Sequence, residues 1–99
     1  MSQQSSLCNA RVEVYTRYFC SFCTRAKSLL DDKHVTYAEY VIIDPAEREK
    51  MIERARGRYT YPQIFINDEP IGGFTDLLRL QMDGELDALL SDEGDLRQS

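Results

Sequence analysis

The sequence predicts a single α/β domain in which a four-stranded mixed sheet is flanked by helices. Segments with the apolar patterning of strands alternate with segments whose apolar residues recur at helical spacing. They follow one another as strand, helix, strand, helix, strand, strand, helix. The first strand–helix–strand unit should place its two strands in parallel, whereas the closing hairpin must be antiparallel. With 99 residues, the chain has room for one hydrophobic core only.

The first half of the chain should form a strand, a helix and a second strand. Polar and apolar residues alternate over 11–15, as they do in a strand. Helical spacing on one face then relates Phe22, Ala26, Leu29 and Leu30. This spacing puts Cys20 at the helix N-terminus and Cys23 in the first turn. Residues 36–43 are rich in β-branched and aromatic side chains and should form the second strand.

A second helix should begin after Asp44 and end at Gly57. Asp44 is a good N-cap, and Pro45 suits the first helical position because its fixed φ fits a helix and its missing N–H would have no partner there. The inward-facing residues at helical spacing are Met51, Ile52 and Ala55. Gly57 then provides a typical helix stop.

A hairpin and a final helical region should complete the domain. The apolar segment 63–66 predicts a strand, and Asn67-Asp68 predicts a tight turn that returns the chain as 69–72. Pro70 restricts that last strand to a sheet edge. Helical spacing resumes at about Thr75 and relates Leu77, Leu78, Gln81, Met82, Leu86, Leu89 and Leu90, with a break at Gly84.

The two ends of the chain differ in composition from the rest. Residues 1–10 are rich in Ser and Gln and should form a flexible tail, and 92–99 should form a polar C-terminal tail. The domain would then occupy 11–91. The start has no basic segment followed by an apolar one, so we expect no secretory signal. No apolar run approaches the ~18 residues that cross a bilayer. We therefore expect a cytoplasmic protein that uses no membrane.

Charge and cysteine content exclude further classes. The formal net charge is −5, which disfavours nucleic acid as a partner because nucleic-acid-binding domains are basic. The three cysteines, Cys8, Cys20 and Cys23, are an odd number, and this argues against a structural disulfide framework. In the reducing compartment expected here, permanent disulfides are rare.

The segment Cys20-Ser21-Phe22-Cys23 is the first candidate for chemistry. A C-x-x-C at the mouth of a helix is typical of thiol–disulfide exchange, because the helix N-terminus favours the reactive thiolate. Arg17, Arg25 and Lys27 add positive potential, so the pKa of Cys20 should lie below that of a free thiol. A zinc site is the alternative, but structural zinc needs four ligands. Beyond this pair the chain offers only Cys8 and His34, which form no second C-x-x-C-like pair.

Two further segments carry weaker signals. Thr60-Tyr61-Pro62-Gln63 could simply start a strand, and Gly72-Gly73 could be a plain turn. Paired glycines before a helix can also let an anionic ligand approach the helix N-terminus.

Taken together, these segments closely resemble the glutaredoxin family over residues 11–90. The resemblance is carried by Tyr15-Thr16-Arg17, Cys20-Ser21-Phe22-Cys23, Thr60-Tyr61-Pro62-Gln63-Ile64-Phe65-Ile66 and Gly72-Gly73-Phe74-Thr75-Asp76-Leu77. It implies a thioredoxin-like fold with a cis Tyr61–Pro62 bond. It also implies an enzyme, a glutathione-disulfide oxidoreductase, with Cys20 as nucleophile and Cys23 as resolving thiol.

The resemblance further implies a glutathione site. Its residues would be Arg17, Phe22, Arg58, Thr60, Tyr61, Pro62, Gly73, Thr75 and Asp76. Arg17 and Arg58 would pair with the glycine carboxylate, and the Tyr61 backbone would hold the cysteinyl unit. Thr75 and Asp76 would meet the γ-glutamyl end. Substrates would be glutathionylated proteins and protein disulfides, served by a monomer.

Departures from the family pattern leave a second function class open. Ser21 stands where the commonest motif has proline, Phe22 where it has tyrosine, and Tyr61 where valine is usual. Some members with Ser at this position share a [2Fe–2S] cluster between two protomers, through the first cysteine and glutathione of each. The monomer would then hold no metal, and a dimer would bind the cluster through Cys20. Cys23 argues against a dedicated cluster carrier.

Two other readings are weaker. A thioredoxin-like donor reduced by a flavoenzyme is disfavoured because no Trp precedes Cys20. We assign no role to Cys8, which lies outside the resemblance.

Overall fold

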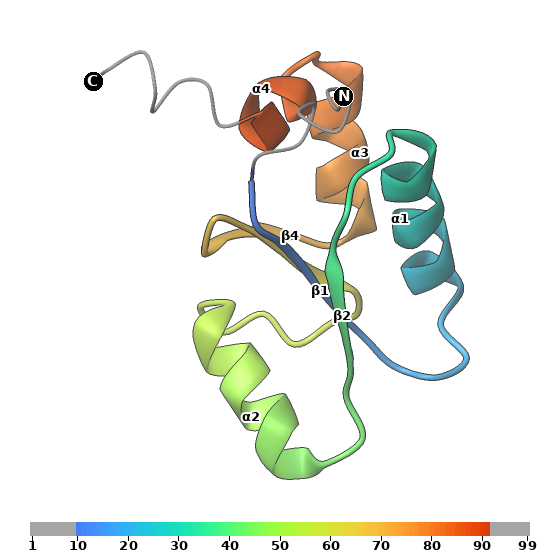
Figure 1. The fold of residues 1–99 in the computed structure, drawn as a ribbon. Coiled ribbons are helices and arrows are strands. Elements are labelled where there is room, and N and C mark those ends of the chain that lie inside the picture. Colours follow the sequence, from blue (N-terminus) through green and yellow to red (C-terminus); the bar gives the residue numbers. More distant parts are fainter. Residues whose placement is uncertain (1–9, 92–99) are drawn as a thin grey trace.

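The structure is a computed structural model that describes residues 10–91 and shows a four-stranded sheet with helices on both faces (Figure 1). Its strands are β1 (Val12–Thr16), β2 (Ala38–Val41), β3 (Gln63–Ile66) and β4 (Glu69–Gly72). Its helices are α1 (Ser21–Asp32), α2 (Pro45–Arg54), α3 (Phe74–Met82) and α4 (Leu86–Ser91). The two predicted tails lie outside the described residues, apart from Ala10.

The sheet is mixed, as the element order predicts. The strand order is β2-β1-β3-β4, with β1 parallel to β2 and antiparallel to β3. β3 and β4 form the closing antiparallel hairpin. Pro70 therefore lies on an edge strand, where its missing N–H interrupts no hydrogen bonding within the sheet.

The hairpin turn has the geometry that its sequence indicates. Asn67 and Asp68 have φ of 52° and 70°, a left-handed pair that matches the twist of two antiparallel strands. The Asn67 side-chain oxygen also accepts a hydrogen bond from the Arg11 N–H at 2.9 Å. This bond fastens the turn to the start of β1.

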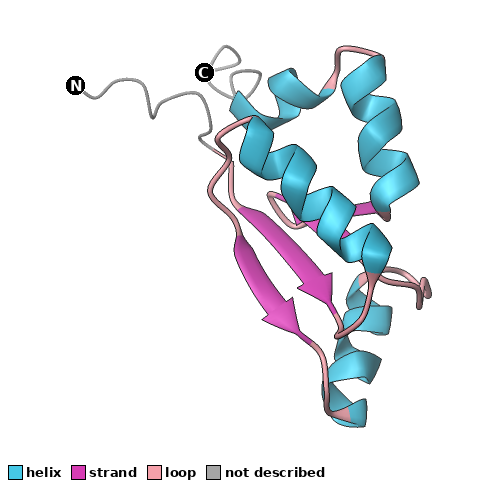
Figure 2. Cartoon of the chain, turned by 90° about the vertical axis from the view of Figure 1, so that its right-hand side faces the viewer, coloured by secondary structure: helices cyan, strands magenta, loops and turns pink. Residues whose placement is uncertain are grey.

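One face of the sheet carries the main hydrophobic core. Along β1, Val12, Val14 and Thr16 are buried, and along β3, Ile64 and Ile66 are buried. The core cluster also includes Ala26 and Leu30 of α1, Leu77 of α3, and Leu86 and Leu90 of α4. Figure 2 shows α1 running alongside the two parallel strands, with α3 beside it. Helices α1, α3 and α4 thus cover one face of the sheet together.

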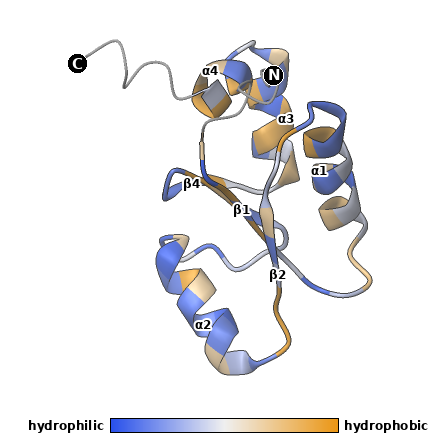
Figure 3. Ribbon diagram, in the orientation of Figure 1, coloured by the Kyte–Doolittle hydropathy of each residue, from blue (hydrophilic) through white to orange (hydrophobic). Residues whose placement is uncertain are grey.

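Helix α2 covers the opposite face and is attached mainly through Arg54. The Arg54 guanidinium lies 4.1 Å from the centre of the Phe65 ring. It donates hydrogen bonds to the Tyr15 hydroxyl at 3.0 Å and to the Glu13 carboxylate. The bond to Glu13 is the main reason that the pKa of Arg54 lies above its usual range. Figure 3 shows α2 as largely hydrophilic, and its fully buried apolar residue is Met51.

The structure differs from the sequence predictions at several points, and β1 begins and ends one residue later than the predicted 11–15. β2 comprises only residues 38–41 of the predicted 36–43, because it is an edge strand that pairs with β1 alone. α2 ends at Arg54, before Gly57, whose N–H donates to the Ile52 carbonyl at 2.8 Å. Met82 is 77% exposed, although its spacing puts it on the inward face, because α3 ends there.

Candidate active site

The two cysteines of the C-x-x-C segment lie at the N-terminus of α1. Cys20 is the N-cap residue, with extended backbone angles, and Cys23 lies in the first turn. A disulfide joins them, with their Cα atoms 5.2 Å apart. The Cys20 Sγ also accepts a hydrogen bond from the Cys23 backbone N–H at 3.2 Å. This N–H would favour negative charge on the Cys20 sulfur.

The two thiol positions differ in exposure. Cys20 is half-buried, whereas Cys23 is only 2% exposed and lies against the body of the protein. A sulfur from another molecule can therefore reach Cys20 more easily than Cys23. After exchange at Cys20, Cys23 can attack the Cys20 sulfur directly, because both residues lie within the first turn of α1.

The loop before β3 lies next to the Cys20 sulfur. The Tyr61–Pro62 bond is cis, as the resemblance implies, and the Tyr61 carbonyl oxygen lies 3.9 Å from Sγ of Cys20. Gln63, which is not among the predicted site residues, fixes the conformation of this loop through two hydrogen bonds. Its side-chain amide donates to the Thr60 carbonyl at 2.9 Å and to the Thr60 hydroxyl at 3.2 Å.

A pocket of about 1000 Å³ opens beside this loop. It is lined by Arg17, Phe22, Arg48, Gly57, Arg58, Tyr59, Thr60, Tyr61, Gly73, Phe74, Thr75 and Asp76. Eight of the nine residues named for glutathione from the sequence are among them. The ninth, Pro62, is buried and does not line the pocket. The pocket thus joins segments that are far apart in the sequence.

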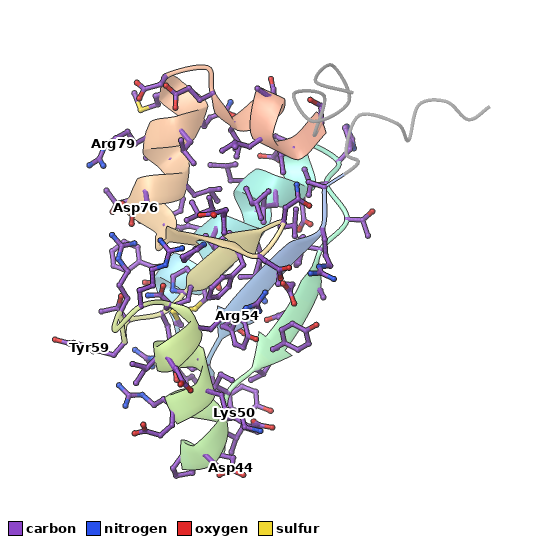
Figure 4. The ribbon with its side chains drawn as sticks, turned by 90° about the vertical axis from the view of Figure 1, so that its left-hand side faces the viewer. Asp44, Lys50, Arg54, Tyr59, Asp76 and Arg79 are labelled. Carbon is purple, nitrogen blue, oxygen red and sulfur yellow. A yellow bond between two sulfur atoms is a disulfide. The ribbon has the colours of Figure 1, made fainter. Side chains whose placement is uncertain are left out.

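Four lining residues were not expected from the sequence: Arg48, Gly57, Tyr59 and Phe74. Gly57, Tyr59 and Phe74 are direct neighbours of predicted residues, so a wider window around each segment would have included them. Arg48 carries no local signal, because α2 is rich in charged residues throughout. Only the packing of the loop after α2 places it there, where its side chain donates to the Tyr59 carbonyl at 3.4 Å. Figure 4 shows Tyr59 projecting away from the chain, between α2 and the start of α3.

The acidic side of the pocket is built at the N-terminus of α3. Asp76 accepts a hydrogen bond from the Gly73 N–H at 3.0 Å, through the same oxygen that lies 3.3 Å from Nη1 of Arg58. Gly72 has a φ of 117°, and a Cβ there would lie 1.9 Å from the Arg58 guanidinium. Glycine at this position therefore leaves room for the ion pair and adopts a backbone conformation that other residues avoid.

The basic side of the pocket includes Arg17, where the chain leaves β1. Its guanidinium lies 5.7 Å from the centre of the Tyr61 ring and donates to the Tyr18 carbonyl at 3.3 Å. Within residues 10–91, neither Arg17 nor Arg48 forms an ion pair with a carboxylate. Both are available to an anionic ligand.

A second pocket, of about 540 Å³, lies on the other side of α1's N-terminus and is lined by Cys20 itself. At its wall the Glu39 carboxylate accepts from Lys27 at 2.9 Å and from the Thr16 hydroxyl at 2.8 Å. Partial burial alone would raise the pKa of Glu39, but these two hydrogen bonds outweigh burial and lower it. Glu39 is therefore a stably charged neighbour of the thiol site.

A disulfide-forming pair at a helix N-terminus, next to a cis-proline loop on a mixed four-stranded sheet, defines a thiol–disulfide oxidoreductase of the thioredoxin-like fold. The sequence model of the glutaredoxin family matches residues 12–71. Glutaredoxin 3 of Escherichia coli is 50% identical over 82 residues, which are 82% of this chain and 98% of that protein. Glutaredoxin 1 of Rickettsia prowazekii is 43% identical over 79 residues, which are 78% of this chain and 83% of that protein. The chain belongs to the glutaredoxin family and is a dithiol oxidoreductase.

Solved structures agree with this assignment. The solution structure of a glutaredoxin from Brucella melitensis is 44% identical, with a TM-score of 0.73 over 82% of this chain and 88% of that one. The buckwheat glutaredoxin–glutathione complex is 24% identical and shows the same fold, with a TM-score of 0.77 over 92% of this chain and 86% of that one. Among residues 10–91, no helix is both long and apolar enough to cross a membrane.

Proposed function

We propose that the protein reduces glutathionylated substrates and protein disulfides with glutathione as electron donor, through Cys20 and Cys23. The observation that carries this proposal is the position of the accessible Cys20 sulfur. It lies beside a pocket large enough for a tripeptide, with unpaired arginines and a carboxylate in its wall. Glutathione has a carboxylate at its glycine end, and an ammonium group and a second carboxylate at its γ-glutamyl end, so it is complementary to such a pocket.

Each end of glutathione has a proposed partner. Arg17 would pair with the glycine carboxylate, and the Tyr61 backbone would hold the cysteinyl unit near Cys20. Thr75 and Asp76 would meet the γ-glutamyl end, where Asp76 accepts from the ammonium. Arg58 lies 3.3 Å from Asp76, so it would have to leave this partner to share the carboxylate with Arg17.

Reduction of a glutathionylated substrate needs Cys20 alone. The Cys20 thiolate attacks the glutathione sulfur of the mixed disulfide, and the substrate leaves as a thiolate that takes up a proton. The glutathionyl group is then bound to Cys20. A second glutathione thiolate attacks this bond, releases glutathione disulfide and restores the Cys20 thiolate.

Reduction of a protein disulfide uses both cysteines. Cys20 attacks one sulfur and forms a mixed disulfide with the substrate, whose other sulfur leaves as a thiolate. Cys23 then attacks Sγ of Cys20 and releases the reduced substrate as a thiol. This attack forms the Cys20–Cys23 disulfide seen in the structure. Two molecules of glutathione reduce that disulfide and leave as glutathione disulfide.

The remaining expectations belong to the same proposal. A site that is reduced by glutathione at each turnover needs a compartment with a reduced glutathione pool, which supports a cytoplasmic location. The catalytic unit would be the monomer formed by residues 11–91, which contains every residue assigned above.

The test is glutathione-dependent reduction of a small glutathionylated substrate by wild type, Cys20→Ser and Cys23→Ser. We expect Cys20→Ser to be inactive, because Cys23, the other thiol among residues 10–91, is buried. Cys23→Ser should keep activity on this substrate and lose it on a protein disulfide. Full activity of Cys20→Ser would contradict the proposal.

Ser21 supports one further candidate function, binding of a [2Fe–2S] cluster. Ser21 is the exposed first residue of α1, directly after Cys20, and it lacks the ring that proline would place beside the sulfur. No group of three or more His, Cys, Asp or Glu side chains within residues 10–91 could hold a metal. A cluster would therefore need Cys20 from two protomers, together with two glutathione thiols.

Cluster binding can be tested by anaerobic reconstitution with iron, sulfide and glutathione, followed by visible absorbance and gel filtration. A coloured dimer that is lost in Ser21→Pro would support this function. A colourless monomer under the same conditions would exclude it.

A further inference from the structure

Exposed aromatic side chains gather around Cys20. Eight large hydrophobic side chains are exposed among residues 10–91. Four of them line the two pockets beside Cys20, and these are Tyr18, Phe19, Phe22 and Tyr59. Exposed apolar residues gathered at one place mark interaction sites more often than scattered ones do.

Phe19 is the most unusual of these residues. Its side chain is fully exposed, at 101% of the reference value, and its ring makes no aromatic or cation–π contact within the described part of the chain. Its φ is 56°, in the left-handed region that bulky residues avoid. The ring therefore adds nothing visible to folding, and glycine would fit this backbone with less strain.

The charge around Cys20 is opposite in sign to that of the whole protein. Four basic side chains line the two pockets, Arg17, Lys27, Arg48 and Arg58, against the two acidic side chains Glu39 and Asp76. Both acids are already paired, with Lys27 and Arg58. Arg17 and Arg48 have no carboxylate partner in the described part of the chain, whose full sequence has a net charge of −5.

Arg25 extends this positive region along α1. It is exposed, and its guanidinium lies 5.9 Å from the centre of the Phe22 ring. It forms no ion pair within residues 10–91. Residues four apart in a helix share a face, so Arg25 lies one turn behind Ser21 and close to the thiol site.

We propose that Tyr18, Phe19 and Arg25 form a docking surface for the polypeptide around the target cysteine, and that this polypeptide is acidic and carries an apolar side chain. The inference rests on the proposed function. A bound glutathionyl group would occupy the larger pocket, so the protein part of a glutathionylated substrate would lie outside that pocket. It would cover the loop of Tyr18 and Phe19 and the exposed side of α1, where Arg25 lies beside Phe22. Phe19 contacts the apolar side chain of the substrate, and Arg25 attracts its acidic residues. Little repulsion opposes this attraction, because both carboxylates in the walls of the two pockets are paired with basic side chains.

The first experiment compares three glutathionylated peptides of equal length with a single cysteine. One has Glu and Leu beside the cysteine, the second has Lys and Leu, and the third has Glu and Ser. We expect wild type to have a kcat/KM about tenfold higher for the Glu–Leu peptide than for the Lys–Leu peptide at low ionic strength. This ratio should shrink as salt is added, because exposed charges are screened. The Glu–Ser peptide should fall about fivefold below the Glu–Leu peptide.

Two variants assign these preferences to residues. Phe19→Gly removes the ring, so it should remove the Leu preference. Because glycine keeps the left-handed backbone, reduction of a small glutathionylated compound should be unchanged. Arg25→Glu should abolish or invert the preference for Glu over Lys. Lys50→Glu is the matched control, since it makes the same charge change on α2, where Lys50 lines neither pocket beside Cys20 (Figure 4).

Equal kcat/KM for the three peptides in wild type would overturn the docking surface. Preferences that survive in both Phe19→Gly and Arg25→Glu, or that Lys50→Glu removes equally, would overturn it as well. Activity on the small glutathionylated compound separates this result from failure of the proposed function. If wild type were inactive on that compound, the glutathione mechanism would be wrong, and the docking surface would be refuted with it.

Discussion

Arg58 and Asp76 form an ion pair that ties the loop before β3 to the first turn of α3. Nη1 of Arg58 lies 3.3 Å from Oδ2 of Asp76, and the same oxygen accepts the Gly73 N–H at 3.0 Å. One carboxylate therefore caps a helix and holds a cation in the pocket wall. Its charge is also the feature that would attract the ammonium group of glutathione.

Asp76→Asn should raise the KM for glutathione about tenfold, with little change in kcat. The asparagine oxygen can still accept the Gly73 N–H, so the helix cap is kept while the charge is lost. Hydrogen bonds to charged groups contribute about 1.5–3 kcal/mol, and the lower value corresponds to about tenfold. Steady-state kinetics with varied glutathione measures this. Asp83→Asn, the same change at the far end of α3, should leave KM unchanged.

Gly72→Ala should lower the free energy of unfolding by about 1–3 kcal/mol, the range for a residue held in a disfavoured backbone conformation. Gly84→Ala is the matched control, because Gly84 also has a positive φ, of 79°, has no atom within 4 Å of an added Cβ and does not line the larger pocket. Both variants should shift the urea midpoint. Only Gly72→Ala should also raise the KM for glutathione, since its Cβ would displace Arg58 and Asp76. An equal KM effect in both would show that the ion pair has no part in binding.

The Cys20 thiol should ionise below pH about 8.5, the value for a free cysteine. The helix N-terminus and the Cys23 N–H both favour its thiolate. The measurement is the pH dependence of alkylation in Cys8→Ser/Cys23→Ser, where Cys20 is the remaining thiol. Cys8→Ser/Cys20→Ser is the control, and its buried Cys23 should react slowly throughout. A midpoint at or above that of free cysteine would contradict the electrostatic argument.

Glu39 should stabilise the fold above pH 4.5 and lose this contribution in acid. Its pKa in the folded protein lies below the ordinary value of 4.5, because the hydrogen bonds from Lys27 and Thr16 outweigh partial burial. The stabilisation is therefore complete above that ordinary pKa and disappears as the pH falls through the lowered one. Urea unfolding from neutral pH to about pH 3 should show a shallower acid loss in Glu39→Gln than in wild type.

The control for Glu39 is Glu49→Gln. Glu49 is exposed on α2 and forms no ion pair within residues 10–91, so its substitution should leave the acid slope as it is in wild type. An unchanged acid slope in Glu39→Gln would show that the Lys27 pair contributes nothing to stability.

Most of the fold follows from local sequence signals. Asp44-Pro45 marks the start of α2, Asn67-Asp68 marks the hairpin, and Gly84 separates α3 from α4, each through the backbone angles that these residues favour. Edge effects are less predictable. β2 is shorter than its β-rich segment because only β1 pairs with it, and pairing is a property of the sheet rather than of the segment.

The candidate site was predictable where its residues belong to short, ordered segments. Cys20, the Tyr61–Pro62 step and Asp76 each lie in such a segment, and the structure brings all three segments to the thiol site. Arg48 was not predictable, because its position in the pocket depends on how α2 packs. The Arg58–Asp76 pair was missed for a related reason, since the two residues are 18 apart in sequence and meet only through the fold.

The attachment of α2 has a consequence for how the molecule moves. Arg54 bonds to Glu13 and Asp68, and together with the buried Met51 and Ala55 it holds this helix outside the main core cluster. α2 and the loop after it supply one wall of the larger pocket, whereas the thiols lie on α1, within the core layer. Local unfolding can therefore begin in α2 and the loop after it, while Cys20 and Cys23 stay in place on α1. Amide hydrogen exchange should be faster in α2 than in α1, and should slow in α2 when the pocket is filled.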